Sequence, residues 1–223
     1  AAGNMASPVT RTVNVVIISD SFQPQTTVEL QTAVDLWVSD ETSAIATYGT
    51  IDTWDVSLIT DMSNLFNEKL TFNGDISTWD VSSVTNMANM FHDCWNFNQD
   101  ISSWNVSNVT SLEGTFEDAR NFNQDISSWD VSSVINMVVM FARAFDFNQD
   151  ISEWDVSNVT TMDYLFWYAT SFNQDISEWD VSNVTTMVEM FYSSNELSDE
   201  NKCAIHLSFS SNDAWYFNWY VFC

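Results

Sequence analysis

A block of 25 residues is written six times in succession between residues 51 and 200. Each copy is close to I-S-x-W-D-V-S-x-V-T-x-M-x-x-M-F-x-x-x-x-x-F-N-Q-D. A unit of this length cannot bury its own apolar face, so neighbouring units must stack on one another and the two ends of the stack need caps. The repeat therefore predicts an elongated stack of coils and excludes an enzyme-like globule.

Apolar residues occupy the same positions in all six copies and should line a continuous core. Two aromatic columns carry much of this pattern: Trp54, Trp79, Trp104, Trp129, Trp154 and Trp179, and Phe66, Phe91, Phe116, Phe141, Phe166 and Phe191. The residues around Asp-Ile-Ser-x-Trp and Val-Thr-x-Met are expected to be extended. The spacing of Met87, Met90 and Phe91 places them on one helical face and predicts a short helical turn in each copy.

One pattern, F-N-Q-D-I-S-x-W-D-V-S-N-V-T-x-M-x-x-M-F, is clearest at residues 147–166 and 172–191. It resembles the leucine-rich-repeat-like block of BspA-type surface proteins of bacteria, mycoplasmas and protists. Residues 30–37 and 197–202 resemble the segments that flank this block. The resemblance implies a β-solenoid at a cell surface, used for adhesion, binding or structure, and it does not imply catalysis.

We therefore expect a leucine-rich-repeat-like β-solenoid of six 25-residue coils with short helical turns. A helical cap should cover its N-terminal end and an aromatic cap its C-terminal end. Residues 26–38 predict an amphipathic helix that begins in a capping box of Thr26 and Glu29. The chain divides into an N-terminal strand or arm, a helical cap, the repeats and a C-terminal cap, at residues 1–20, 21–50, 51–200 and 201–223.

The charge balance is strongly acidic. Five lysines and arginines stand against 31 aspartates and glutamates, a formal net charge of −26. This charge argues against nucleic acid and against an anionic membrane surface as direct partners. No apolar stretch is long enough to span a bilayer, so we expect no direct membrane insertion. The chain begins with Ala1 instead of Met, which favours a processed N-terminus, although an artificial start would look the same. We predict a secreted or cell-surface protein.

The cysteines and histidines limit the chemistry. Cys203 and Cys223 bracket the C-terminal cap, and an exported chain would join them in a disulfide, whereas Cys94 has no obvious partner. With only His92 and His206, no zinc site and no nucleophile–histidine arrangement can be proposed. We expect no enzymatic activity and no required cofactor.

Two acidic columns run along the stack. Neighbouring coils should lie roughly 4.8 Å apart, where unit charges repel by about 1 kcal/mol even in water. Each Asp could close a turn by accepting backbone N–H bonds, or a row of calcium ions could bridge the carboxylates. Asn105 replaces Asp in the first column, which includes Asp80, and so favours the turn role there. For the second column calcium stays open: Asp75, Asp100, Asp125, Asp150 and Asp175.

Asn-x-Ser/Thr sequons provide candidate glycosylation sites. Three of them occupy the same repeat position, where other copies have Leu or Ser, as expected of an exposed turn: Asn108, Asn158 and Asn183. A fourth, Asn105, stands in the first acidic column. The alternative is that Asn serves there only as a turn residue.

The two ends differ most from the repeat. Residues 11–19 are rich in β-branched residues and predict a strand without a sequence neighbour. We predict head-to-tail self-association through Val13, Val15, Ile17, Trp215, Tyr216, Phe217, Trp219, Tyr220 and Phe222. The main functional hypothesis is a structural surface protein that assembles through its ends, into filaments. The alternative is a monomeric adhesin whose lateral face binds glycan, protein or mineral, with both ends folded back on their own chain.

Overall fold

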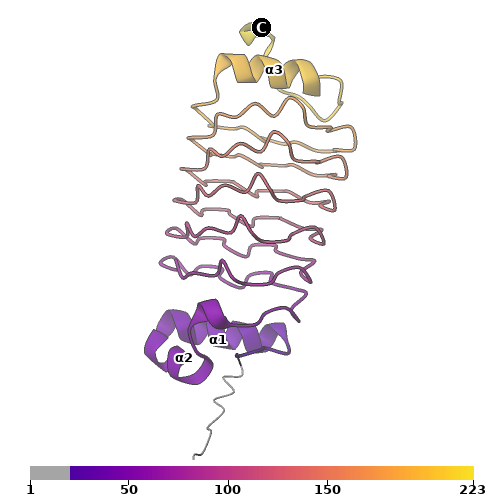
Figure 1. Cartoon of the computed structure of the whole chain (residues 1–223). Coiled ribbons are helices and arrows are strands. Elements are labelled where there is room, and N and C mark those ends of the chain that lie inside the picture. The colour runs from indigo at the N-terminus through magenta and orange to yellow at the C-terminus, as the bar shows by residue number, and fades with distance from the viewer. Residues whose placement is uncertain (1–20) are drawn as a thin grey trace, which may run out of the picture.

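The computed structural model describes residues 21–223, which form a stack of six coils between helices (Figure 1). Helices α1 (Thr27–Ser39) and α2 (Glu41–Tyr48) lie at one end, and a 3-10 helix, η1 (Ile51–Thr53), leads into the first coil. Helix α3 (Asp199–Phe209) lies at the other end. The helical segment was expected to start at a capping box, and the Thr26 side chain does accept a hydrogen bond from the Glu29 N–H at 3.2 Å.

The predicted β-solenoid is wrong, because residues 21–223 contain no β-strand and no sheet. Between η1 and α3 the backbone consists of turns and irregular segments. The predicted short helical turns are wrong as well, since the segment from Met87 to Phe91 is a run of turns. Adjacent coils share isolated parallel bridges, at Asp61–Asn86, Asn86–Ser111, Ser111–Asn136, Asn136–Thr161 and Thr161–Thr186.

Left-handed residues explain why no helix forms between Met87 and Cys94 or at the equivalent positions of the other coils. Each coil has two residues with positive φ four positions apart, and in the second coil these are Asn89 (55°) and Asp93 (57°). A left-handed residue interrupts both helical and extended backbone. The chain turns sharply instead: the Met90 N–H donates to Met87 O at 3.1 Å, and the Cys94 N–H donates to Phe91 O at 3.0 Å. The three- and four-residue spacing therefore marks buried positions along successive turns.

Between residues 62 and 68, the backbone hydrogen bonds to the second coil all run in one direction, from N–H groups of the first coil to carbonyls of the second. Every second N–H from residue 62 to residue 68 donates to a carbonyl of the next coil, at 2.9–3.0 Å. The first coil is therefore left with carbonyl oxygens at its outer edge. Helix α1 covers them: Thr27 Oγ1 donates to Asp61 O at 2.8 Å, and Gln31 Nε2 donates to Leu65 O at 3.0 Å. Because Thr27 and Gln31 share one helical face, α1 satisfies the edge that would otherwise be open.

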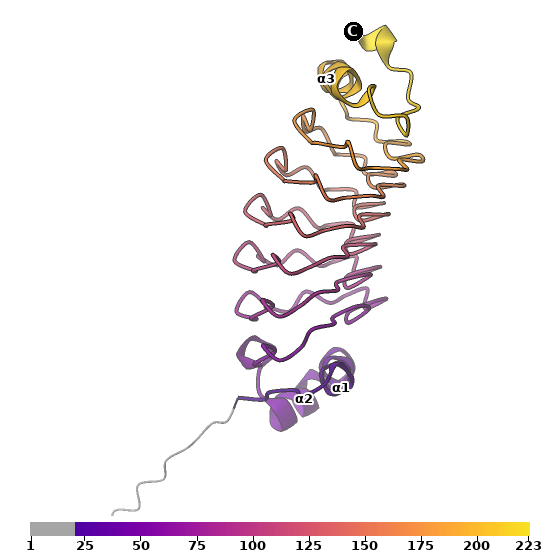
Figure 2. The same ribbon diagram turned by 90° about the vertical axis from the view of Figure 1, so that its right-hand side faces the viewer.

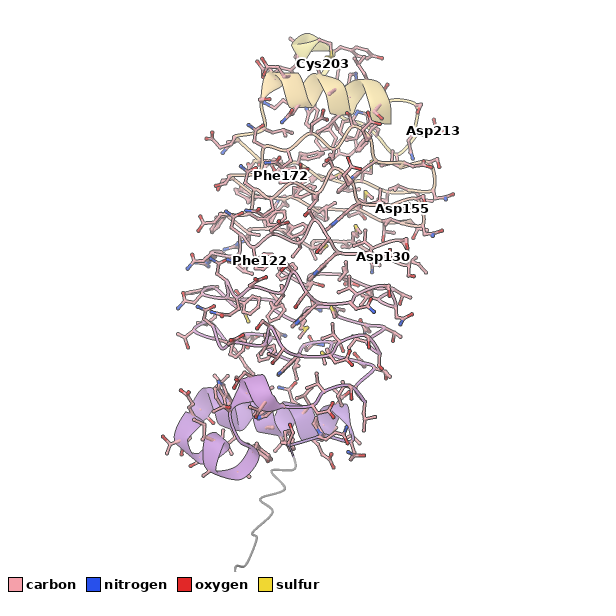
Figure 3. All side chains as sticks on the ribbon, in the orientation of Figure 1. Phe122, Asp130, Asp155, Phe172, Cys203 and Asp213 are labelled. Atoms are coloured by element: carbon pink, nitrogen blue, oxygen red, sulfur yellow. A yellow bond between two sulfur atoms is a disulfide. The ribbon has the colours of Figure 1, made fainter. Side chains whose placement is uncertain are left out.

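The aromatic columns fill the core. Phe91, Phe116 and Phe141 are fully buried, and successive ring centroids lie 5.6 and 5.7 Å apart. In the first five coils a second Phe packs on the first, as Phe122 does on Phe116 with ring centroids 3.9 Å apart, and the sixth coil has Leu197 at this position. In the tryptophan column, each indole N–H from Trp79 to Trp179 donates to a carbonyl of the coil before it, as Trp104 Nε1 does to Ile76 O at 3.1 Å. Figure 3 places Phe122 and Phe172 toward one side of the stack, and Asp130 and Asp155 toward the other.

The C-terminal cap closes the opposite end of the stack. Figure 2 shows α3 lying across the last coil, far from α1 and α2. Its N-cap Ser198 accepts a hydrogen bond from the Asn201 N–H at 3.1 Å, and Ile205 and Phe209 are buried beneath it. The chain then folds back, and a final 3-10 helix, η2 (Tyr220–Phe222), follows.

Candidate functional site

One segment of each coil departs from the repeat. It follows the phenylalanine column that begins at Phe66 and ends at Phe191, and its five positions change from copy to copy. We call this surface the variable edge, and it comprises residues 67–71, 92–96, 117–121, 142–146, 167–171 and 192–196. Three of the five lysines and arginines of the chain lie in it: Lys69, Arg120 and Arg143. Unique side chains that could recognise a ligand are therefore concentrated here, whereas the other faces repeat the same groups.

A stack of aromatic rings and a guanidinium runs along the variable edge. Arg120 occupies the same repeat position as Trp95 and Phe145 in the coils on either side of it. Its guanidinium carbon lies 3.8 Å from the centroid of the Trp95 ring and 5.8 Å from that of Phe145. This arrangement is a cation–π contact on both faces of the guanidinium.

The carboxylate of Asp118 fixes the two arginines. Arg120 Nε donates to Asp118 Oδ1 at 2.7 Å, and Arg143 Nε lies 2.8 Å from Asp118 Oδ2. Asp118 is buried, so this pairing is screened less by solvent than a surface ion pair. The Arg143 side chain remains 40% exposed and makes no further ion pair within residues 21–223. The edge therefore presents a guanidinium in a fixed position.

His92 lies beside two carboxylates of the same edge. Its Nε2 is 3.4 Å from Asp93 and 3.9 Å from Glu117. Burial raises the pKa of the Glu117 carboxyl above its usual range, while the charge of His92 acts in the opposite direction. His92 thus forms a small polar cluster with Asp93 and Glu117 on the variable edge.

A hollow of about 370 Å³ opens next to this stack. It is lined by Arg143, Phe145, Trp167 and Tyr168. The rings of Trp167 and Tyr168 meet edge to face, with centroids 4.5 Å apart and planes at 79°. The Trp167 indole N–H is buried and has no hydrogen-bond partner in the described part of the chain. Aromatic side chains and a guanidinium thus line one small concave site.

A second hollow, of about 720 Å³, lies between the last coil and α3. Its lining includes Asp180, Ser211 and Asp213, and it contains no Lys, Arg or His. Asn212 reaches across this junction, donating through Nδ2 to Val184 O at 2.9 Å. This second hollow is larger but holds neither a cation nor a catalytic pair, so the variable edge is the better candidate site.

The predicted calcium ligands close turns in their own coils. Asp100 Oδ1 accepts a hydrogen bond from the Ser102 N–H at 3.0 Å. Bonds of the same kind are accepted by Asp75, Asp125, Asp150 and Asp175. Hydrogen bonds from Ser102 hold the pKa of Asp100 below its usual range. Within residues 21–223 no group of three or more His, Cys, Asp or Glu side chains is placed to hold a metal ion.

The first acidic column has the same geometry, and it gives a direct test of the turn role. Asp80 Oδ1 accepts from the Ser82 N–H at 3.0 Å, and Asn105 Oδ1 accepts from the Ser107 N–H at 3.2 Å. Asp80→Asn should therefore leave the free energy of unfolding at pH 7 nearly unchanged, whereas Asp80→Ala should lower it by about 1 kcal/mol. Urea unfolding of the three proteins measures this difference, and equal losses in both variants would contradict the turn role.

The pH dependence of Asp80 follows from its lowered pKa, which hydrogen bonds from Ser82 cause. Because the folded state favours the ionised carboxylate, its stabilising effect is present above the unfolded pKa of about 3.9. The effect is lost as the pH falls through the lower folded pKa. The range from pH 5 to pH 2 covers the unfolded pKa of about 3.9 and the lower folded pKa. Asp80→Asn should lack this contribution, so it should lose slightly less stability over this range than the natural protein.

The three predicted glycosylation sites lie on an exposed turn. Their side-chain amides form a ladder along the stack, in which Asn108 Nδ2 donates to Ser82 O at 2.8 Å. The corresponding bonds of the other two run from Asn158 to Ser132 and from Asn183 to Ser157. These asparagines are exposed as residues, and glycosylation of them stays a prediction.

The residues predicted to mediate assembly fall into three groups: some lie outside the described residues, some are buried, and some are exposed. Three of them lie outside the described residues: Val13, Val15 and Ile17. Trp215 is buried, and Phe217 and Trp219 pack against the core of their own chain. Tyr216 and Tyr220 are 54% and 65% exposed. The Tyr216 hydroxyl also accepts a hydrogen bond from the Glu189 N–H, so it covers part of the outer edge of the last coil.

The cysteines occupy different environments. A disulfide joins Cys203 in α3 to Cys223, and the neighbouring Lys202 Nζ lies 4.8 Å from the centroid of the Phe222 ring. Cys94 is free and buried, and its thiol donates to Phe66 O at 2.9 Å. Burial raises the pKa of the Cys94 thiol to about 12.

The buried thiol predicts slow alkylation of Cys94. Since the thiolate is the reactive form and the thiol has a pKa of about 12, iodoacetamide at pH 8 should leave Cys94 unmodified in the folded protein. The same reagent in guanidinium chloride should modify it completely. Mass spectrometry of the peptide that contains Cys94 measures both states, and rapid modification of the folded protein would contradict the burial.

Comparison with known families places the chain. A family model described as "Mycoplasma protein of unknown function, DUF285" matches residues 37–144 and, in a second match, residues 103–204. The chain belongs to this family. Together the DUF285 matches extend from α1 into α3 and include the whole variable edge. No curated protein and no solved structure matches the chain. Residues 21–223 contain no helix with the length and apolarity that crossing a membrane requires.

Sequence analysis did not single out the variable edge as a site. A signal was present, because cations and aromatic residues gather at the positions where the copies differ. Trp95, Arg120 and Phe145 are spaced by one repeat each, so a stacked fold brings them side by side. The hollow could not be predicted from the repeat spacing, because it also depends on the side-chain orientations of Trp167 and Tyr168.

Proposed function

We propose that this DUF285 protein is a non-catalytic surface-binding module that holds its ligand against the variable edge. The observation that carries the proposal is the stack of Trp95, Arg120 and Phe145 with the adjoining hollow, on a chain that is otherwise strongly acidic. Arginine and aromatic residues are enriched where proteins bind their partners. The resemblance of the repeats to BspA-type surface proteins supports an extracellular or cell-surface location.

The ends of the stack support lateral binding over exchange of backbone edges. A filament built by pairing the first coil of one molecule with the last coil of another would need both edges open. Side chains of Thr27 and Gln31 already occupy the carbonyl edge of the first coil. At the last coil, the Tyr216 hydroxyl accepts from the Glu189 N–H, and Trp215 packs on Phe191 with ring centroids 6.2 Å apart.

End-to-end assembly through side chains is a second candidate, because the C-terminal cap has an apolar outer surface. Leu207, Tyr220 and Val221 are 63%, 65% and 81% exposed, whereas terminal caps of repeat proteins need a polar outer face for solubility. Sedimentation of the intact protein at rising concentration tests this candidate. Association that Leu207→Ser with Val221→Ser abolishes would support it, and a monomer at high concentration would rule it out.

The lateral site is tested with a double variant, Arg143→Asn with Phe145→Thr. Phe145→Thr introduces the residue of the next coil, Thr170, and Arg143→Asn suits the left-handed backbone at φ 58°. The control combines Leu58→Ser with Ile135→Thr, two exposed apolar residues that lie outside the variable edge. Both control changes also restore residues found in other copies.

Binding is measured on immobilised collagen, laminin and mucin, with the intact protein in solution. We expect saturable binding to at least one of these surfaces, loss of binding in the double variant of the variable edge, and unchanged binding in the control. Thermal melts establish that all variants are folded. Absence of binding to every surface, or binding that the edge variant retains in full, would refute the proposal.

A further inference from the structure

We infer that the hollow formed by Arg143, Phe145, Trp167 and Tyr168 binds a neutral sugar ring, a pyranose unit of a glycan. The inference rests on the proposed function and specifies the chemistry of its ligand. A pyranose presents an apolar C–H face and a rim of hydroxyl groups. It therefore requires an aromatic surface surrounded by a few hydrogen-bonding groups, and this hollow contains both.

The shape of the hollow suits one or two sugar rings. Its volume of about 370 Å³ is near the lower end of the range for small-molecule sites, about 300–1,000 Å³. The planes of Trp167 and Tyr168 meet at 79°, so one aromatic face can form a floor and the other ring a wall. Phe145 adds apolar surface, and it belongs to the stack that also holds Arg120.

The polar groups of the hollow match a ligand rich in hydroxyls. Asp118 holds Arg143 through Nε at 2.8 Å, which leaves the terminal nitrogens of a partly exposed guanidinium as donors. The Trp167 indole N–H is itself buried, so this residue supplies the hollow with aromatic surface and not with a donor. The Tyr168 hydroxyl can donate or accept.

Charge and polarity exclude the other ligand classes. A polyanion would be repelled by a chain of net charge −26, and a cation would meet the Arg143 guanidinium. A purely apolar peptide would cover the partly exposed Arg143 guanidinium without pairing it, which is costly. A neutral glycan avoids all three penalties.

The test uses the intact protein and simple sugars as probes: methyl α-mannoside, methyl β-galactoside and N-acetylglucosamine. Saturation-transfer NMR detects contact with the sugar C–H groups, and calorimetry measures the affinity. We expect at least one sugar to bind saturably. Arg143→Asn should weaken it by roughly tenfold or more, because a hydrogen bond to a charged group is lost.

A second variant reduces the aromatic surface of the hollow. Trp167→Phe replaces the indole with a smaller ring, so we expect weaker binding in a protein whose melting temperature is close to that of the natural chain. The control Ile135→Thr, outside the hollow, should bind the sugar with unchanged affinity. Equal affinity in Arg143→Asn, Trp167→Phe and the natural protein would overturn the inference.

Periodate oxidation of the immobilised surfaces distinguishes this inference from the proposed function. If binding through the variable edge disappears after oxidation and free sugar competes for it, the glycan assignment is supported. If binding survives oxidation but is still lost in Arg143→Asn with Phe145→Thr, the edge is a binding site and the glycan assignment fails. If neither surfaces nor sugars bind, both fail.

Discussion

Replacing Phe116 by Ala should lower the free energy of unfolding by about 3–5 kcal/mol. Phe116 is fully buried, and its ring lies 3.9 Å from Phe122, 5.6 Å from Phe91 and 5.7 Å from Phe141. The substitution would open a cavity in the middle of the stack, where contacts to the coils on both sides are lost. Guanidinium unfolding followed by circular dichroism measures the change.

The matched control for this core prediction is Ser83→Ala. Ser83 is exposed on a turn of the second coil, so its substitution should change the free energy of unfolding by no more than about 0.5 kcal/mol. The melting temperature of Phe116→Ala should fall by roughly 10 °C, given about 2–4 °C per kcal/mol for a chain of this size. Similar small shifts in both variants would show that the ring column does not stabilise the stack.

Removing the Cys203–Cys223 disulfide should destabilise the C-terminal cap by about 3 kcal/mol. The bond closes a loop with a sequence separation of 20 residues, and it holds η2 near α3. Without it the unfolded cap gains conformational freedom, and the packing of Trp215 and Trp219 on Phe191 becomes easier to lose. Thermal unfolding of Cys203→Ser with Cys223→Ser, followed by tryptophan fluorescence, should show the loss.

The control for the disulfide prediction is Cys94→Ala. Other copies have Ala119, Ala144 and Ala169 at the position of Cys94, so alanine fits this site. The control should keep both the disulfide and the stability of the cap, and a reducing agent should destabilise it as much as the natural protein. An unchanged melting temperature under reducing conditions would contradict the prediction, and a disulfide to Cys94 in peptide maps would overturn the cap.

The prediction of short helical turns failed at particular residues, at and just after the Met137–Phe141 segment of the fourth coil. Val139 has φ 50° and Arg143 has φ 58°, values that a β-branched or bulky residue rarely adopts on its own. Contacts with the next coil select them: the Val139 N–H donates to Asp163 O at 2.9 Å, and the Arg143 N–H donates to Trp167 O at 2.7 Å. The local conformational preferences of these residues do not indicate a left-handed turn. Hydrogen bonds to the next coil override these preferences.

The helices were also predicted only in part. The capping residues Thr26 and Ser198 mark the starts of α1 and α3, but only the first of these helices was predicted. The amphipathic pattern predicted an apolar face of Leu30, Ala33, Val34 and Trp37; the first three are buried, and Trp37 is partly buried against the core. It did not reveal that Thr27 and Gln31 bind carbonyls of the first coil, because those partners are 34 residues away.

By itself the sequence determined the number and length of the coils, the residues that line the core, and the acidic character of the surface. These properties follow from the repeat, because any stack must align equivalent residues. Only the tertiary structure decided that the coils are built from left-handed turns, that α1 covers the first edge, and that Trp167 and Tyr168 enclose a hollow with Arg143. Those outcomes depend on hydrogen bonds and packing between residues about one repeat apart, which local sequence preferences do not encode.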